Sequence, residues 1–497
     1  MSTASSRGTP PGPPAGKQAG EDDRRDRREA NLTERPPSAT VAVVLGGSHS
    51  GMLAAAALAG LADRVILVER DVLPSGPASR KGLPQARHVH QLWSGGAIAL
   101  EELLPGVTRR LRAAGAHRLP VTTDMVALSP RGWFRRWHES HFMLLCSRDL
   151  LDATVRAQVL ADDRIELLEG AEVLGLDGTG AAVTGVRVRV ADAERTLRAD
   201  LVVDATGRSS RTPRWLTELG LPTPRSRTVD PGLTYASRRY RAPELAREGY
   251  PVISVQPDAR SGRPGHGGVL LPIEDGQWLV TLYGTCGGEP SADAADFARY
   301  ARAELRHPIV ADLVERAEPL TDVALTRTTA NHRHYYERMP VWPENFAVLG
   351  DAVAAFNPVY GHGMSVAAQG AVALRAVIRR HGWGAPGLSR RIQKAIARPV
   401  AAAWDLAIGQ DVFYPGATEE GPTARDRLVA AYVDRLMYTA TGNGRIARRV
   451  TDVTSLERRA EVLLAPSVLL AAAVGPLKPT LTEPPLTAEE LKKADLQ

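Results

Sequence analysis

The sequence predicts an α/β protein in which a doubly wound, Rossmann-like domain carries an inserted β-sheet domain and a helical C-terminal region. The first observation is residues 41–70, where an apolar strand, a glycine-rich turn, an alanine-rich helix and a second apolar strand follow one another. The second is residues 267–284, where apolar and polar residues alternate around the turn EDGQ, as in a β-hairpin. The third is the mainly helical pattern of residues 395–475.

The elements between these landmarks follow from periodicity and turn residues. Residues 147–162 have a helical pattern with Ser147 as the N-cap, and Gly-punctuated strands follow from residue 165 to 190. Residues 199–208 form a buried strand that ends in a glycine loop. A further helix is expected at 293–305, and residues 345–380 return to strand, loop and long helix.

The composition bounds the class of protein. The chain has 497 residues, 43% hydrophobic and 24% charged, with a net charge of +6, and these values are ordinary for a globular protein. The basic residues are spread along the chain among acids, so we expect no nucleic-acid partner. Cys146 and Cys286 lack the spacing of a metal site or a disulfide framework, which favours reduced thiols in the cytoplasm.

No signal peptide is evident, and no apolar run reaches the ~20 residues that span a bilayer. The closest run, residues 462–477, is broken by Pro466 and Gly475. A packed amphipathic or buried helix is favoured there over a segment that touches a membrane.

The stretch GGSHSG, residues 46–51, indicates a nucleotide-binding turn. Gly46, Ser48 and Gly51 occupy the glycine positions of G-x-G-x-x-G, with a small serine where the pyrophosphate approaches. Alone, this pattern is equally typical of a structural turn. Glu69 ends the next strand 18 residues after Gly51, where an acid accepts hydrogen bonds from ribose hydroxyls and disfavours a 2′-phosphate.

Three later segments favour FAD over NAD as the dinucleotide. DATGR, residues 204–208, closes a strand with a loop that passes near the cofactor. Asp351 follows a strand and is placed to accept from a ribityl hydroxyl. The helix that starts near Gly363 and Met364 directs its free amides at the flavin, where its dipole stabilises the negative charge of reduced flavin.

The ordered motifs GGSHSG, VILVER, LPQARHVHQL, CSRDLLD, DATGRSSRTP and GDAVAAFNPVYGHGM resemble the FAD-dependent monooxygenases with the para-hydroxybenzoate hydroxylase fold. This resemblance covers residues 40–400. Within that group, the segments GLPQARHVHQL and VLLPIEDGQWLVTLYG are most similar to the polyene epoxidases of polyether-ionophore biosynthesis, as in the monensin and lasalocid pathways, which are squalene epoxidase-like.

The resemblance implies further site residues. Arg148 matches an arginine that contacts the cofactor near its phosphate and ribityl part, and Val173 matches a residue whose backbone meets the adenine. Arg87 and His88 lie on a loop near the flavin, although a structural network with His90 explains that loop equally well. The residues expected to bind non-covalent FAD are Gly46, Gly47, Ser48, Ser50, Gly51, Glu69, Arg70, Arg87, Arg148, Val173, Gly207, Asp351, Gly361, Gly363 and Met364.

The function that the resemblance implies is epoxidation of E-alkenes of a linear polyene polyketide through a flavin C4a-hydroperoxide, in polyether antibiotic biosynthesis. O2 is the oxidant, and electrons come from NAD(P)H directly or through a flavin reductase. An epoxide hydrolase or cyclase would act next. This chemistry needs positioning and dryness rather than a general base, so no catalytic residue is assigned. Phe356, Pro358, Trp278 and Tyr283 are pocket candidates, with a core role equally open for Trp278. No metal is expected.

Other functions remain open on this framework. An FAD-dependent aromatic hydroxylase is the main alternative, followed by an isoprenoid-chain reductase. A halogenase would carry Trp-x-Trp-x-Ile-Pro, and GWFRRW has a different spacing. A flavin-binding protein without catalysis is the least favoured.

The domain division follows from the motifs. Residues 1–38 are expected to be a disordered tail. Residues 39–220 and 326–395 form the FAD-binding domain, residues 221–325 the substrate-binding β-sheet domain, and residues 396–497 the helical C-terminal region.

Overall fold

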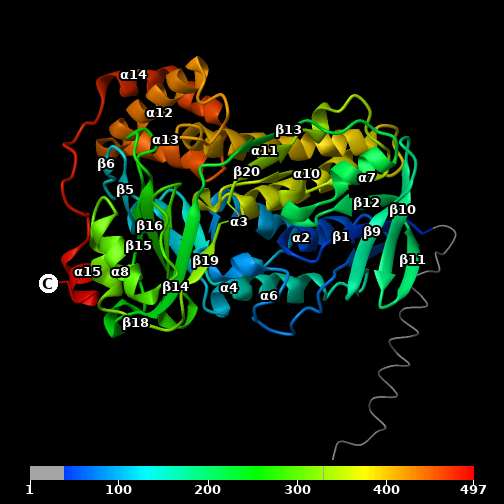
Figure 1. The fold of residues 1–497 in the computed structure, drawn as a ribbon, viewed down its shortest axis with the longest axis horizontal. Helices are drawn as coiled ribbons and strands as arrows, with labels where there is room; N and C mark the ends of the chain where they lie inside the picture. The colour runs from blue at the N-terminus through cyan, green and yellow to red at the C-terminus, as the bar shows by residue number, and fades with distance from the viewer. Residues whose placement is uncertain (1–38, 328, 497) are drawn as a thin grey trace, which may run out of the picture.

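The computed structural model describes residues 39–327 and 329–496, so the tail expected at residues 1–38 lies outside the described part of the chain. Two sheet-based units lie at opposite ends of the molecule, and long helices run between them (Figure 1). This arrangement confirms the predicted α/β class with a Rossmann-like domain, further sheets and C-terminal helices.

The first unit is built on a parallel sheet. Every neighbouring pair of its five strands runs parallel, and β1 is buried along its whole length, as expected for the apolar run VAVVL. In sheet order, the strands are β21 (Phe346–Val348), β12 (Leu201–Asp204), β1 (Val41–Leu45), β2 (Arg64–Val68) and β8 (Ile165–Leu168).

Helices cover this sheet, and an antiparallel meander extends the unit. In α6, the Ser147 side chain accepts a hydrogen bond from the Leu150 amide at 3.2 Å, so Ser147 caps the helix. The helices are α2 (His49–Leu58), α3 (Ser94–Leu103), α4 (Val107–Ala113), α6 (Arg148–Val159), α7 (Thr212–Glu218) and α10 (Gly363–His381). The meander consists of β9 (Ala171–Gly178), β10 (Val183–Val190) and β11 (Ala193–Arg198).

The second unit is an eight-stranded sheet. Helices α8 (Ala294–Ala303) and α9 (Ile309–Val314) cover one of its faces. In sheet order, its strands are β18 (Glu318–Pro319), β14 (Thr234–Arg241), β17 (Gln277–Gly284), β16 (His266–Ile273), β15 (Val252–Val255), β5 (Met125–Ser129) and β6 (Gly132–Trp133), with β19 (Ala324–Thr326) paired to β14.

This sheet differs from the expected domain division, which placed residues 39–220 wholly in the FAD-binding domain. Residues 125–133 contribute β5 and β6 to the second sheet, where β5 pairs in parallel with β15. The pairing spans more than a hundred residues of sequence, so no local pattern predicts it. The turn EDGQ does join β16 to β17 as an antiparallel hairpin.

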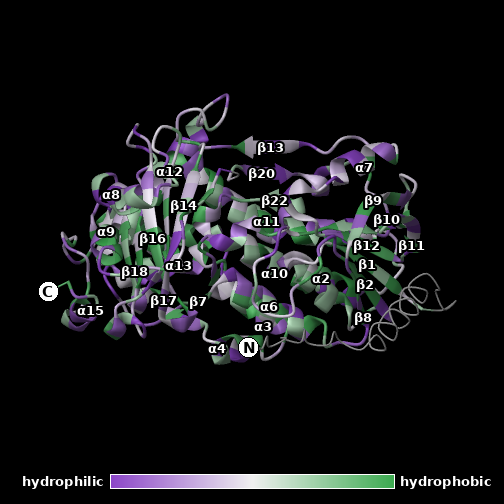
Figure 2. Ribbon diagram, turned by 60° about the horizontal axis from the view of Figure 1, so that its bottom comes forward, coloured by the Kyte–Doolittle hydropathy of each residue, from purple (hydrophilic) through white to green (hydrophobic). Residues whose placement is uncertain are grey.

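Two small sheets connect the units. The first small sheet packs against the second unit's sheet. In sheet order, its strands are β3 (Gln91–Trp93), β7 (Phe142–Leu145) and β4 (His117–Pro120), and the short helix α5 (Val121–Asp124) follows β4 in the chain. The second small sheet lies between the two units, with β13 at the outer edge and the buried β22 innermost (Figure 2). Its strands are β13 (Ser226–Val229), β20 (Asn331–His334) and β22 (Ala354–Ala355).

The C-terminal region is mainly helical. It contains α11 (Leu388–Asp411), α12 (Ala424–Gly442), α13 (Gly444–Thr454), α14 (Pro466–Val474) and α15 (Ala488–Lys493). The run at residues 462–477 includes α14, which packs through one side and leaves apolar side chains exposed on the other. Val468 and Ala472 are buried, but Leu470 and Val474 are 68% and 66% exposed. Within the described residues, no helix has the length and hydropathy needed to cross a bilayer.

Gly51 tests the fit of α2 against the turn before it. A Cβ at this position would lie 1.6 Å from the Gly46 carbonyl oxygen. We expect Gly51→Ala to lower the free energy of unfolding by about 3 kcal/mol, the upper end of the cost of overpacking, and to abolish FAD retention. Gly60→Ala is the control, because a Cβ there meets nothing within 4 Å. Equal urea midpoints for the two variants would contradict the close packing.

Candidate cofactor and substrate site

The site lies where the carboxyl ends of four parallel strands meet at one edge of the sheet. β1 ends before Gly46, β2 ends before Glu69, β12 ends before the loop that contains Gly207, and β21 ends before Gly350 and Asp351. Ligands of open α/β sheets bind at this edge. The sequence motifs, far apart in the chain, are therefore neighbours in space.

The turn from β1 to α2 has the form of a dinucleotide cradle. Gly46 has a φ of +95°, and a Cβ there would lie 2.7 Å from the Ala205 carbonyl oxygen. Ser48 is the N-cap residue of α2, but its side chain does not cap the helix. The first amides of α2 are thus left for an anion, and small residues leave room for a pyrophosphate, so this turn fits FAD.

Glu69 is buried beside this turn. Its carboxylate accepts hydrogen bonds from the Gly47 amide at 2.7 Å and the Asp71 amide at 2.9 Å. Arg80 lies 3.2 Å from Glu69 and donates to the Ser48 hydroxyl at 2.8 Å. Arg80 escaped the sequence analysis, because a lone arginine in a loop carries no motif. Its guanidinium places a cation beside the expected pyrophosphate position.

Asp351 lies next to the glycine turn. Gly350 has a φ of +68°, and a Cβ there would lie 2.2 Å from the Ser50 hydroxyl, so the two loops touch. Burial raises the pKa of Asp351, and the guanidinium groups of Arg208 and Arg148 oppose the rise. A partly buried carboxylate in this position fits an acceptor for a ribityl hydroxyl.

The start of α10 faces the same region. Gly361 has a φ of +64° and precedes the helix, and a Cβ at Gly363 would lie 3.7 Å from Asp351. No side chain caps the helix, so its first amides, at Gly363 and Met364, are left for a ligand. The His362 ring is held from behind by the Thr454 carbonyl at 2.9 Å.

Arg148 lies at the start of α6 and is buried. It donates to Asp152 at 2.7 Å, and its charge acts on both His49 and His90. Burial lowers the pKa of His49 to about 4 and of His90 to about 3, with Arg148 adding to both effects. Neither ring nitrogen of His49 has a hydrogen-bond partner within the described residues. An unpaired buried ring beside the turn is consistent with a polar ligand there.

The remaining expected cofactor residues are Arg70, Arg87, Gly207 and Val173. Arg70 and Arg87 are exposed, and their role in binding FAD stays a prediction. Gly207 starts a 3-10 turn with a φ of +81°. The Val173 carbonyl accepts a hydrogen bond from Arg211 at 2.6 Å at the meander side of the site.

A hydrophobic wall on the second sheet faces the loop before α10. Tyr235 and Tyr283 are directly opposite each other on β14 and β17, and their rings lie 5.7 Å apart. Leu233 and Val359 pack with them. Because Val359 comes from the loop that precedes α10, this wall packs against that loop.

His88 joins the same wall. Its Nδ1 lies 2.8 Å from the Ser237 hydroxyl, which in turn lies 2.6 Å from the Thr281 hydroxyl. Burial lowers the pKa of His88 to about 4, with Arg87 adding to the effect, so the ring is neutral at pH 7. A neutral imidazole fixed at one nitrogen can accept or donate one proton at the other.

The four pocket candidates separate in the structure. Tyr283 belongs to the wall, and Pro358 is exposed on the loop. Phe356 is buried in the core of the first unit. Trp278 lies on the opposite face of β17, where its ring packs 5.0 Å from Tyr250. Side chains five residues apart on a strand point to opposite faces, so Trp278 is a core residue and Tyr283 is not.

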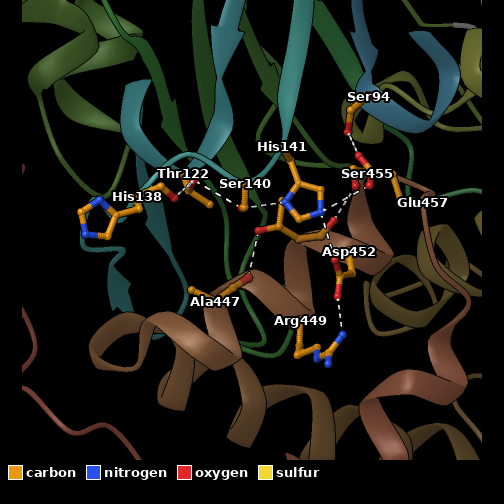
Figure 3. Close-up of polar contacts among 11 residues, drawn as sticks. Ser94, Thr122, His138, Ser140, His141, Ala447, Arg449, Asp452, Ser455 and Glu457 are labelled. Carbon is orange, nitrogen blue, oxygen red and sulfur yellow. Dashed lines mark hydrogen bonds and ion pairs between the residues drawn. The ribbon is translucent and has the colours of Figure 1, made fainter. Parts of the chain in front are cut away.

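A second polar cluster surrounds His141 (Figure 3). His141 contacts the Ser140 hydroxyl through Nδ1 at 2.8 Å and the Asp452 carboxylate through Nε2 at 3.1 Å. Its composition is that of a hydrolytic triad, but His141 is 3% exposed and Asp452 is shared with Arg449. A nucleophile there could not reach a substrate. The cluster joins α13 to the segment before β7.

The fold and the strand-end site define a flavoprotein. Residues 42–210 match the family model described as FAD dependent oxidoreductase. The chain is 30% identical over 398 residues to Protein Rv3254 of Mycobacterium tuberculosis (strain ATCC 25618 / H37Rv), covering 76% of this chain and 81% of the relative. The chain therefore belongs to one family with Protein Rv3254, and its residues 42–210 form an FAD-dependent oxidoreductase domain.

Solved structures with the same fold include flavin-dependent oxygenases. The p-nitrophenol 4-monooxygenase PnpA from Pseudomonas putida DLL-E4 is 17% identical with a TM-score of 0.59, over 84% of this chain and 99% of that one. PqsL, a probable FAD-dependent monooxygenase from Pseudomonas aeruginosa, is 16% identical with a TM-score of 0.56, over 76% and 99%. The flavin-dependent brominase Bmp2 is 16% identical with a TM-score of 0.57, over 84% and 94%. At these identities the likeness shows the fold alone.

Asp351 provides a direct test of the cofactor site. Asp351→Ala removes the acceptor for a ribityl hydroxyl, and such a charge-assisted bond is worth on the order of 1.5–3 kcal/mol. The Kd for FAD should therefore rise roughly 10- to 150-fold in a fluorescence titration. Asp192→Ala, in an exposed turn, is the control and should leave the Kd unchanged. An unaltered Kd for Asp351→Ala would remove Asp351 from the site.

The buried histidines predict a pH dependence of stability. Burial lowers the pKa of both His49 and His362 to about 4, against 6.5 for a free histidine. The unfolded chain then binds more protons below pH 6.5, so stability is complete above pH 6.5 and is lost as the pH falls toward 4. Each histidine should lower the free energy of unfolding by about 2 kcal/mol at pH 5.

Urea unfolding at pH 7.5 and pH 5 measures this loss. His362→Gln keeps a donor for the Thr454 carbonyl but does not titrate. The free energy of unfolding of this variant should therefore fall by about 2 kcal/mol less between pH 7.5 and pH 5 than that of the wild type. Equal losses in the two proteins would show that His362 is not buried in the neutral form.

Proposed function

We propose that this protein is a flavin-dependent monooxygenase that epoxidises E-alkenes of a linear polyene polyketide. The single observation that carries the proposal is the uncharged wall of Leu233, Tyr235, Tyr283 and Val359 beside the loop before α10. Such a wall suits a long apolar chain rather than a charged substrate. The resemblance of the motifs to the polyether epoxidases supports the same substrate class.

A bound reduced flavin would supply the two electrons with which one atom of O2 enters the alkene and the other leaves as water. Ser48, Glu69, Arg80 and Asp351 would hold the cofactor, and the first amides of α10 would stabilise negative charge on its ring. The wall would orient the alkene and exclude water. No side chain has to remove a proton from the substrate, because an alkene gives none up. NAD(P)H or a flavin reductase would provide the electrons, and a hydrolase or cyclase would consume the epoxide.

One observation favours a second function, the hydroxylation of an aromatic ring. His88 is neutral, is fixed by Ser237, and lies 6.2 Å from the Tyr235 ring. A phenol substrate would have to be deprotonated, and the free His88 Nε2 could accept that proton. The two functions therefore differ in their need for His88.

The decisive experiment reduces the holoprotein without oxygen, adds 18O2 with either a linear polyene or a set of phenols, and analyses products by mass spectrometry. Epoxide that carries one 18O atom is expected with the polyene. His88→Ala should lower its yield by less than roughly tenfold, because no base is needed. An 18O-labelled phenol formed faster than any epoxide, and lost in His88→Ala, would establish the hydroxylase instead.

The wall also leads to a prediction about how much of the consumed O2 ends in product rather than in hydrogen peroxide. Tyr283→Ala opens the wall to water, so hydrogen peroxide should be released in place of product, and the ratio of peroxide to labelled product should rise roughly tenfold. Tyr438→Ala, on the exposed surface of α12, is the matched control. A ratio that stays at the wild-type value in Tyr283→Ala would place the substrate elsewhere.

A further inference from the structure

A buried carboxylate lies behind the loop before α10. Asp411 is the last residue of α11 and is 1% exposed. Its oxygens accept hydrogen bonds from Asn331 at 2.7 Å, Asn357 at 2.9 Å and the Tyr360 hydroxyl at 2.6 Å. Among the described residues, no Lys, Arg or His forms an ion pair with it. Three neutral donors therefore solvate this charge.

The partners of Asp411 come from different parts of the fold. Asn357 and Tyr360 belong to the loop of residues 356–361, which carries Pro358 and Val359 toward the wall. Asn331 is on β20, and its side-chain oxygen accepts a hydrogen bond from the backbone N–H of Asn357 at 2.7 Å. Asp411 thus joins the C-terminal helix α11 to this loop from two directions.

The loop is also tied to the second sheet. The Tyr235 hydroxyl donates to the Asn357 side-chain oxygen at 2.9 Å, and the same oxygen accepts from the Val359 amide at 3.1 Å. Because the side-chain oxygen of Asn357 accepts these two bonds, its side-chain NH2 group points at Asp411 and donates to it. One asparagine therefore receives its orientation from the wall on one side and from Asp411 on the other.

The three converging donors favour a carboxylate at position 411 in spite of the cost of its burial. Burial raises the pKa of Asp411 to about 6, while the bonds from Tyr360, Asn357 and Asn331 oppose that rise. Buried charges without a cation are costly, and packing alone would favour a neutral side chain. A carboxylate accepts from all three donors at once, whereas an asparagine would present an N–H group in place of an acceptor to at least one of them.

We propose that Asp411 is a positioning residue of the oxygen-transfer site, which fixes the loop of residues 356–361 between the start of α10 and the wall of the second sheet. This inference rests on the proposed function only in taking that loop as a border of the oxygen-transfer site. Asp411 touches neither cofactor nor substrate. It acts through Asn357 and Tyr360, and so lets the C-terminal region set the geometry of a site in which it has no reacting group.

The test compares Asp411→Asn and Tyr360→Phe with Asp405→Asn, an exposed acid on the same helix. All are prepared as FAD-loaded full-length protein. We expect the first two to keep bound FAD but to shift the visible flavin spectrum. After anaerobic reduction and mixing with O2 alone, both should release hydrogen peroxide roughly five- to tenfold faster than the wild type, as for one lost hydrogen bond. Asp405→Asn should match the wild type.

The double variant Asp411→Asn with Tyr360→Phe distinguishes a specific positioning role from an unspecific loss of stability. Tyr360→Phe should add nothing to Asp411→Asn, because both remove the same contact. Unchanged spectra and peroxide rates in both single variants would overturn the proposal. Equal changes in Asp405→Asn would overturn it as well, because the effect would then be unspecific. If Asp411→Asn does not fold, Tyr360→Phe, which loses only a hydroxyl, decides.

These measurements need no substrate, so they are independent of the proposed function. A wild type that forms no epoxide but shows the expected spectral and peroxide changes would refute the epoxidase and retain the role of Asp411. A protein that forms epoxide with normal coupling in both variants would refute the role of Asp411 alone.

Discussion

The whole site depends on a close backbone approach at the carboxyl edge of the parallel sheet. Gly51 packs on Gly46, and Gly350 packs on Ser50, at distances that leave no space for a Cβ at either glycine. These contacts bring the start of α2 and the Asp351 loop together, although 300 residues separate them in sequence. Any side chain at either glycine would separate the groups that cradle the pyrophosphate from the acid that meets the ribityl chain.

The second sheet is joined to the rest of the molecule by apolar packing on the β3–β7–β4 sheet and by a set of polar contacts. The clusters of buried apolar side chains in the two units are distinct. Between them lie the chain from His88 through Ser237 to Thr281 and the bond from Tyr235 to Asn357. Directional bonds of this kind add defined orientations to the packed contacts between the two units. The side chains of the wall and of the loop before α10 therefore have defined orientations.

The sequence predicted the parts of the site that are local. The glycine turn, Glu69 and the loop around Asp351 each follow a strand, and strand ends of a parallel sheet meet by topology. Arg80 and Asp411 could not be predicted, because each acquires its role from partners that only the tertiary fold brings near. The contrast between Trp278 and Tyr283 is similar. Alternation along β17 puts them on opposite faces, but which face meets the cofactor domain is set by strand pairing with distant segments, including β5.

Helix α11 explains how the C-terminal region reaches into this geometry. Near its start, Ser389 and Gln393 satisfy backbone groups of β21, the edge strand of the parallel sheet: the Phe346 amide donates to Ser389 at 3.2 Å, and the Val348 amide donates to Gln393 at 2.9 Å. The helix thus closes a sheet edge that would otherwise be unpaired. Its 24 residues span ~36 Å, and Asp411 at its end meets the loop before α10.

One helix, with Pro399 in its interior, therefore starts beside the strand that leads into the Asp351 loop and ends on the loop next to the wall. The His141–Asp452 cluster then fastens α13 to the segment before β7, so the helices after α11 are anchored to the same body (Figure 3). A displacement of α11 along its axis would break bonds to β21 and to the Asn357 loop together. The strand that leads into the Asp351 loop and the loop before α10 are consequently linked through a single helix, which unfolds locally less readily than a loop does.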